Sequence, residues 1–268
     1  MPERYNNEIF ADVLGKHSFF RKMYIYLTQS LLLKNNIIRR EIKLCGRRKK
    51  KSQHVLYPGF GMGQILALFA KFPSKYNVLA LDKNTGLVVD SSQYYKEEDI
   101  QNIYCRSGDI TEFEQKEGFD LALAINLLNY VEDDTKVLRN MYLSLRKPGI
   151  LLVFNSSNYA DDRESRLNIG VYNDTKYRNG YGIIELKHKL KEAGFAKVKA
   201  RYVYGTFGIW SWKLTTAWPS EMIRYSKATF LILPFYTLIC IPFVLVFNLL
   251  DMNFYHKKGK CVVLKAFK

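Results

Sequence analysis

The feature that most constrains the fold is a glycine-rich turn between an apolar run and a second apolar run. Residues 55–58 are strand-like and lead into Gly59, Gly61 and Gly63, and residues 64–70 are helix-like. Glycine tolerates positive φ angles and lets a ligand approach the backbone closely, while a helix start presents free N–H groups. The stretch therefore predicts a strand, a tight turn and a helix start. Because such turns occur in several fold families, the rest of the chain is needed to identify the fold and the ligand of this one.

After this turn, short apolar runs alternate with helix-like segments. The runs that predict strands are residues 78–81, 103–105, 119–125 and 150–154. Strands of this kind separated by helices, such as the one expected at about residues 135–145, are typical of a parallel sheet with helices on both faces. Ligands bind such sheets beyond the carboxyl ends of the strands, where the glycine turn, Asp82 and Asp109 all lie.

Composition narrows the class of partner. The chain has 268 residues and is 48% hydrophobic, which fits a globular protein with a substantial core. Its 41 Lys and Arg against 25 Asp and Glu give a net charge of +16. This charge favours a polyanionic surface as partner, and nucleic acid and anionic lipid both satisfy it.

The cysteines and the first residues bear on location. The four cysteines are Cys45, Cys105, Cys240 and Cys261. They form no C-x-x-C pair and have no His at ligand spacing, so we expect a reducing compartment and no metal site. Residues 1–8 lack the basic-then-apolar layout of a signal peptide, which predicts a cytoplasmic main domain.

Residues 55–154 resemble the core of a class I S-adenosylmethionine-dependent methyltransferase, with the motifs in the family's order. The resemblance rests on the glycine turn, on Asp82 closing the second strand and on Gly108-Asp109 after the third. The turn at residues 145–149 is also similar to the family's lead into its fifth strand. The resemblance implies an α/β, Rossmann-like fold with a mostly parallel seven-stranded sheet.

The resemblance also implies a site for S-adenosylmethionine. In the family, the glycine turn holds the methionine part, the acid after the second strand holds the ribose hydroxyls, and the Gly-Asp pair reaches the adenine. Carboxylates suit these roles because they accept hydrogen bonds from hydroxyls and from exocyclic amines. The implied cofactor-binding residues are Tyr57, Gly59, Gly61, Gly63, Asp82, Asp109, Ile110 and Asn126.

Tyr57 departs from the family pattern. The family usually has an acidic residue two positions before the first glycine, where it orders the loop and engages the ammonium group of the cofactor. Tyr57 offers only a neutral hydroxyl. A non-catalytic membrane adaptor that kept the fold and lost the cofactor is therefore an alternative to an enzyme.

The end of the fourth strand bears on the methyl acceptor. Enzymes that methylate base amino groups commonly have Asn or Asp, two prolines and an aromatic residue here to hold a flipped base. Residues 126–130 lack the prolines and look more like the small-molecule and quinone-biosynthesis branch. A nucleic-acid methyltransferase, favoured only by charge, is thus a third hypothesis. The candidate substrate-pocket residues are Asn129, Tyr130, Tyr159 and Tyr172. The catalytic residues are unknown, because no general base is evident and methyl transfer can depend mainly on positioning.

A long apolar insertion separates the last two predicted strands, residues 197–203 and 260–267. It contains all three tryptophans, Trp210, Trp212 and Trp218, and an uncharged run of 23 residues from 228 to 250. About 20 apolar residues are enough to span a bilayer. Both ends of the insertion must return to one sheet, however, and basic residues flank the run on both sides.

These features predict docking on the membrane rather than crossing. Pro234 and Pro242 are expected to break the run into short helices. We expect an in-plane or re-entrant hairpin, with tryptophans at the headgroups and lysines on anionic phosphates. A buried hairpin or a dimer surface is the alternative.

The sequence thus predicts three parts. They are an N-terminal helical cap with a basic linker (1–51), a methyltransferase core (52–204 with 259–268) and the insertion (205–258). The predicted function is methyl transfer from S-adenosylmethionine to a lipophilic small molecule or lipid. The enzyme is expected to be peripheral or monotopic on the inner face of the membrane.

Overall fold

The fold was analysed in a computed structural model. It describes residues 26, 28–46, 52–61, 63–158, 178, 180–225 and 232–268. The chain divides into two compact units, which are described separately. We call residues 38–158, 174–201 and 261–268 the sheet unit, and residues 1–37, 159–173 and 202–260 the helical unit. The three-part division expected from the sequence stays a prediction.

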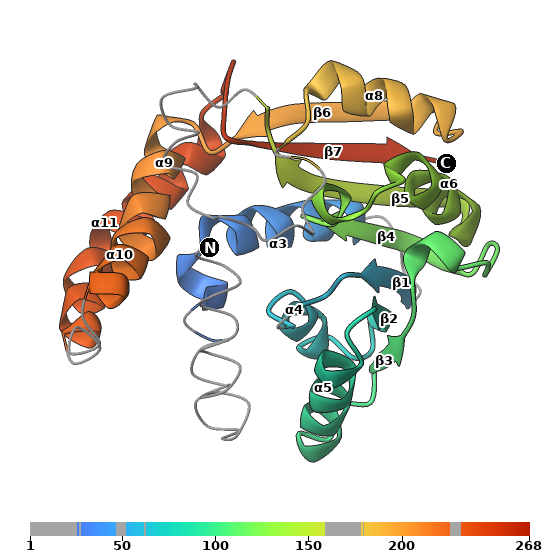
Figure 1. Cartoon of the computed structure of the whole chain (residues 1–268), viewed down its shortest axis with the longest axis horizontal. Coiled ribbons are helices and arrows are strands. Elements are labelled where there is room, and N and C mark those ends of the chain that lie inside the picture. The colour runs from blue at the N-terminus through green and yellow to red at the C-terminus, as the bar shows by residue number, and fades with distance from the viewer. Residues whose placement is uncertain are drawn as a thin grey trace. The chain divides into compact units, whose positions relative to one another are not determined.

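Seven strands form one sheet in the order β3-β2-β1-β4-β5-β7-β6 (Figure 1). The strands are β1 (Gln53–Pro58), β2 (Tyr76–Asp82), β3 (Ile103–Ser107), β4 (Phe119–Ile125), β5 (Leu145–Ser156), β6 (Lys197–Val203) and β7 (Cys261–Phe267). Strands β1 to β5 pair in parallel, whereas β7 is antiparallel to β5. The mostly parallel, seven-stranded sheet expected from the sequence is confirmed.

Burial explains why the central strands are almost continuously apolar. Val55 and Leu56 of β1 are fully buried, and residues 121–124 of β4 are at most 1% exposed. A strand covered by helices on both faces has no side that favours polar residues. The short apolar runs of the sequence are therefore the core of the sheet.

Helices connect the strands of the sheet unit. They are α3 (Leu33–Gly46), which begins in the helical unit, α4 (Leu66–Ala70), α5 (Thr85–Glu97), α6 (Asp134–Ser144), α8 (Ile183–Glu192) and the short η1 (Ile110–Glu112) and η2 (Leu128–Tyr130). Right-handed crossovers place α4 and α5 on one face and α6 on the other, because the chain moves in opposite directions from β1. Side-chain caps begin α5 and α6: Asn84 accepts from the N–H of Leu87, and Asp133 from the N–H of Lys136.

The helical unit contains an antiparallel helical hairpin. Its elements are α9 (Thr206–Trp212), the π-helical η3 (Lys213–Ala217), α10 (Trp218–Tyr225) and α11 (Leu233–Asn253). The first three follow one another without a break, and α9 and α10 lie beside α11 in Figure 1. The end of α11 meets the start of α9, since the N–H of Gly208 donates to Asp251 at 2.8 Å. The start of α11 meets η3 through the Tyr236 hydroxyl, 3.0 Å from the carbonyl of Leu214.

The expected break of the apolar run at its prolines is wrong. α11 is one helix of 21 residues, with Pro234 in its first turn and Pro242 inside. A proline in the first turn costs little because the N–H groups there have no partner within the helix. Pro242 removes a single hydrogen bond, and packing against neighbouring helices supplies most of the stability of a helix in a protein.

A buried ion cluster ties α3 to the last two strands of the sheet unit. The Glu41 carboxylate lies 2.9 Å from the Arg201 guanidinium of β6 and 2.6 Å from the Lys265 ammonium of β7. Burial would raise the pKa of Glu41, but the hydrogen bonds and charges of Lys265 and Arg201 outweigh it. The pKa therefore lies below its ordinary value of 4.5.

We predict that Glu41→Gln lowers the free energy of unfolding by about 2 kcal/mol at pH 7, because the buried carboxylate loses its charge beside the partly exposed Arg201 and Lys265 side chains. Since the pKa of Glu41 is lowered by folding, its contribution is present above pH 4.5 and is lost as the pH falls through the folded-state pKa. Urea denaturation at several pH values measures this. The control, Glu114→Gln at an exposed position, should change stability by less than about 0.5 kcal/mol. A pH-independent difference for Glu41→Gln would contradict the assignment.

Candidate functional site

The glycine turn after β1 combines positive φ angles with close packing. Gly59, Gly61 and Gly63 have φ angles of 65°, 53° and 73°. A Cβ on Gly59 would lie 2.9 Å from the side chain of Leu127, and one on Gly63 would lie 3.1 Å from the hydroxyl of Tyr95. A Cβ on Gly61 would meet nothing within 4 Å. The turn therefore requires glycine for its conformation and leaves open space beside Gly61.

Asp82 holds this turn from the neighbouring strand. Its Oδ2 accepts a hydrogen bond from the N–H of Gly61 at 3.3 Å, and its Oδ1 accepts one from the N–H of Asn84 at 3.0 Å. The pairing of Pro58 with Leu81 places the two strand ends side by side. Each carboxylate oxygen can accept a further hydrogen bond. Asp82 thus orders the turn and keeps acceptor capacity for the hydroxyls of a ligand.

Asp109 follows β3, the next strand of the sheet. It caps η1 by accepting from the N–H of Thr111 at 2.8 Å, and the ammonium of Lys83 lies 2.7 Å from its Oδ2. Burial would raise the pKa of Asp109, but the bonds from Lys83 and Thr111 outweigh it and lower the pKa. Ile110, the following residue, is buried. Sequence analysis missed Lys83, although a basic residue directly after Asp82 was the available signal.

Tyr57 is a buried, neutral residue of β1. Its side chain is 3% exposed, and its strand partner is Ala80. Burial, and secondarily the charge of Asp82, raise the pKa of the Tyr57 hydroxyl, which stays protonated at physiological pH. The position before the turn, where the family usually has an acidic residue, therefore carries no negative charge in this chain. The carboxylate that hydrogen-bonds the turn comes from Asp82 instead.

The other predicted residues lie at the end of β4 or beyond β5. Asn126 directly follows β4 and has a φ angle of 53°. Asn129 is buried and accepts a hydrogen bond from the amide of Asn155, a partner that sequence analysis did not foresee. Tyr130 is exposed. The remaining two pocket residues, Tyr159 and Tyr172, lie outside the described residues.

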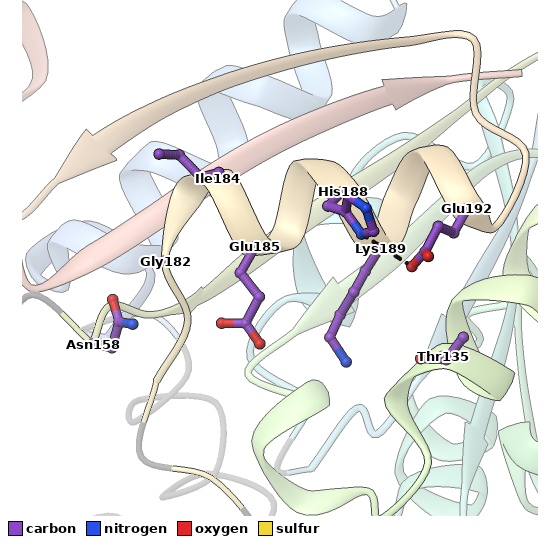
Figure 2. Close-up of a pocket in the computed structure, with 8 residues that line it drawn as sticks. All are labelled: Thr135, Asn158, Gly182, Ile184, Glu185, His188, Lys189 and Glu192. Atoms are coloured by element: carbon purple, nitrogen blue, oxygen red, sulfur yellow. Dashed lines mark ion pairs between the residues drawn. The ribbon is translucent and has the colours of Figure 1, made fainter.

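A separate hollow of about 610 Å³ lies between α8 and the start of α6. Its lining residues are Thr135, Asn158, Gly182, Ile184, Glu185, His188, Lys189 and Glu192. Figure 2 shows Glu185 and Lys189 projecting from one side of α8, away from Ile184. Glu185 lies 2.6 Å from Arg178, and Lys189 lies 2.5 Å from Asp134. None of the predicted cofactor residues lines this hollow. Its other two ionisable residues, His188 and Glu192, lie 3.2 Å apart.

The turn, Asp82 and Asp109 are brought together because β1, β2 and β3 are adjacent and parallel. Their carboxyl ends form one edge, with open space beside Gly61 and two carboxylates next to it. These groups fit a nucleoside cofactor with ribose hydroxyls and an exocyclic amine. Among the described residues, no group of three or more His, Cys, Asp and Glu side chains is placed to hold a metal ion.

Comparison with known proteins agrees with this geometry. A family model described as a methyltransferase domain matches residues 49–199, more than half of the chain. A search of curated proteins returns no match. The matched residues include the glycine turn, Asp82 and Asp109.

Solved structures show the same fold. Phosphoethanolamine N-methyltransferase 2 of Haemonchus contortus, solved with S-adenosyl-L-methionine, has a TM-score of 0.61 and 15% identity over 98% of this chain and 60% of that chain. A methyltransferase of Thermotoga maritima, described as a possible histamine N-methyltransferase, has a TM-score of 0.56 and 13% identity over 97% and 99%. The [4+2]-cyclase SpnF has a TM-score of 0.54 and 16% identity over 86% and 80%. At these identities the likeness concerns the fold alone.

We predict that Asp82→Ala weakens the binding of S-adenosylmethionine by about 1 to 3 kcal/mol, because it removes hydrogen bonds to a charged group and frees the turn. Calorimetric titration measures the affinity. The matched control is Asp120→Asn, at the opposite end of the parallel strands, where the carboxylate accepts from the N–H of His54. The control should keep the affinity within about twofold. Unchanged affinity in Asp82→Ala would contradict the ribose assignment.

Proposed function

The chain belongs to the S-adenosylmethionine-dependent methyltransferases, and from this premise we propose that its methyl acceptor is a lipophilic small molecule or lipid reached at a membrane surface. S-adenosylmethionine, when bound, supplies a methyl group activated by its sulfonium. The chain's own residues bind and orient: the glycine turn with Asp82 on one side, and Asp109 with Lys83 on the other. Positioning of this kind can supply most of the rate of an in-line displacement.

The observation that carries the proposal is the uncovered apolar surface of α11. This helix is long and apolar enough to cross a membrane by length and composition, yet only 17% of its most apolar window is buried. Exposed apolar surface of this extent marks a protein or membrane interaction site. A lipophilic acceptor dissolves in the bilayer, so an enzyme held there meets it at a high local concentration.

The acceptor atom is a separate question. Proteins of the same fold carry names that specify carbon and amine methylation. The net charge of +16 would also suit an acceptor on nucleic acid. These alternatives predict different products, and one labelling experiment distinguishes them.

We expect methyl-labelled S-adenosylmethionine, incubated with the enzyme and a membrane lipid extract, to label a product that partitions into organic solvent. Asp82→Ala should lower the rate at subsaturating cofactor by about fivefold or more, following its loss of affinity. Asp120→Asn is again the control. Label found only in water-soluble amines, or only in RNA, would overturn the proposed acceptor class. Identification of the labelled component by mass spectrometry then gives the acceptor.

A further inference from the structure

α11 buries a narrow stripe of its surface within the helical unit. The buried residues are Val244, Asn248 and Asp251, which follow one another at spacings of four and three. This spacing places them on one side of the helix. Two of the three are polar, although the helix as a whole is apolar. The side of α11 that faces protein is thus its more polar side.

Asp251 anchors the end of α11 to the start of the hairpin. The side chain is fully buried and accepts from the N–H groups of Tyr204 at 3.1 Å and Gly208 at 2.8 Å. His256 Nε2 lies 3.2 Å from its Oδ1. A Cβ on Gly208 would lie 2.7 Å from the carboxylate, so this close approach requires glycine. Buried charges need such partners, which fixes α11 against α9.

Asn248 and Tyr236 add polar anchors along the same helix. The Ser211 hydroxyl donates to the amide oxygen of Asn248 at 2.6 Å, and the amide nitrogen donates to the carbonyl of Leu31 at 2.9 Å. Tyr236, in the first turn of α11, donates to the carbonyl of Leu214. These bonds hold both ends of α11 along the hairpin.

The outward side of α11 is apolar and exposed along its whole length. The exposed residues are Phe235 (70%), Leu238 (69%), Ile239 (68%), Phe243 (56%), Leu245 (48%), Val246 (53%) and Leu249 (64%). Their spacings of three, four and seven form one broad face. A water-facing helix has polar residues in these positions. The polarity of α11 is therefore the reverse of that of a soluble surface helix.

Aromatic and basic side chains also reach the surface elsewhere in the helical unit. Trp210 and Trp218 are 43% and 44% exposed and meet edge to face, with ring centroids 6.2 Å apart. The ammonium of Lys213 lies 5.0 Å from the ring centre of Trp210. Beyond the end of α11, Tyr255 and Lys257 are exposed. Tryptophan, tyrosine and lysine are the residues that prefer the headgroup layer of a bilayer.

We propose that the outward side of α11 inserts into one leaflet of an anionic bilayer, with the helix axis along the membrane plane. The reason for docking rests on the proposed function, a lipophilic methyl acceptor. The evidence for docking comes from the contacts and exposed residues of the helical unit. The net charge of +16 repels a second copy of the chain and attracts anionic lipid.

A single crossing of the bilayer by α11 does not fit the same observations. The hairpin leaves the sheet at β6 and returns at β7, and β7 and β6 are neighbours in the sheet. A helix that crossed the bilayer once would separate these two ends. It would also carry Asp251 and Asn248 out of the hydrogen bonds that satisfy them, at a cost of several kcal/mol per charge.

Tryptophan fluorescence tests the proposal without a label, because all three tryptophans of the chain lie in this hairpin. We expect vesicles containing phosphatidylglycerol to shift the emission to shorter wavelength. Vesicles of phosphatidylcholine alone should give a much smaller shift. Lipids brominated near the headgroup should quench more than lipids brominated near the chain end. Stronger quenching from the chain end would overturn the in-plane arrangement.

Co-sedimentation of the full chain with the same vesicles tests which residues insert. The double variant Ile239→Glu, Phe243→Glu should lower the partition coefficient by about tenfold or more. The matched control is Val89→Glu, an equally exposed aliphatic residue of α5 in the sheet unit, which should change it by less than about twofold. Circular dichroism confirms that both variants are folded. Vesicle binding equal to that of the unmodified chain would overturn the proposal.

Gel filtration tests the other possible occupant of the outward side of α11, a second copy of the chain. A dimer that the double variant dissociates, together with no vesicle binding, would assign the face to a second copy and overturn the lipid assignment. These measurements need neither methyl donor nor acceptor. A negative result in the vesicle experiments therefore does not affect the labelling experiment. A negative result in the labelling experiment does not affect the vesicle experiments.

Discussion

The cofactor site depends on the parallel pairing of β1 with β2. This pairing sets Pro58 beside Leu81, so the glycine turn and Asp82 emerge next to each other at one edge of the sheet. The carboxylate then accepts the N–H of Gly61 on one oxygen and that of Asn84 on the other. Since β1 is buried on both faces, the turn is mounted on a rigid support while its open side faces solvent.

The neutral Tyr57 changes the electrostatics of this edge without removing its negative charge. The Asp82 carboxylate accepts the N–H of Gly61, and the Asp109 carboxylate lies 2.7 Å from the ammonium of Lys83. The carboxylate that hydrogen-bonds the turn, Asp82, lies one strand away from Tyr57. The resemblance alone could not indicate this, because it compares positions along the chain rather than partners across strands.

Sequence reasoning found the strands because buried parallel strands are almost purely apolar, as residues 121–124 illustrate. The full order of the strands was not predicted, since apolar runs do not state which neighbours pair. Tyr95 and Asn155 could not be identified in advance, because each acts through a partner that only tertiary pairing supplies. The expected break at Pro234 is wrong because a proline in the first turn costs little. The expected break at Pro242 is wrong because packing of α11 offsets the one hydrogen bond that an interior proline removes. The assignment of individual residues to the cofactor and to the acceptor pocket stays a prediction.

The neighbouring positions of β7 and β6 have a consequence for evolution. Whatever joins them begins and ends at adjacent points, so its length and composition can change without altering the register of the other strands. The hairpin closes on itself through Asp251 and Gly208 rather than through the sheet. Evolution can therefore replace this one connection and change where the protein is located in the cell. The residues of the cofactor site remain under separate selection.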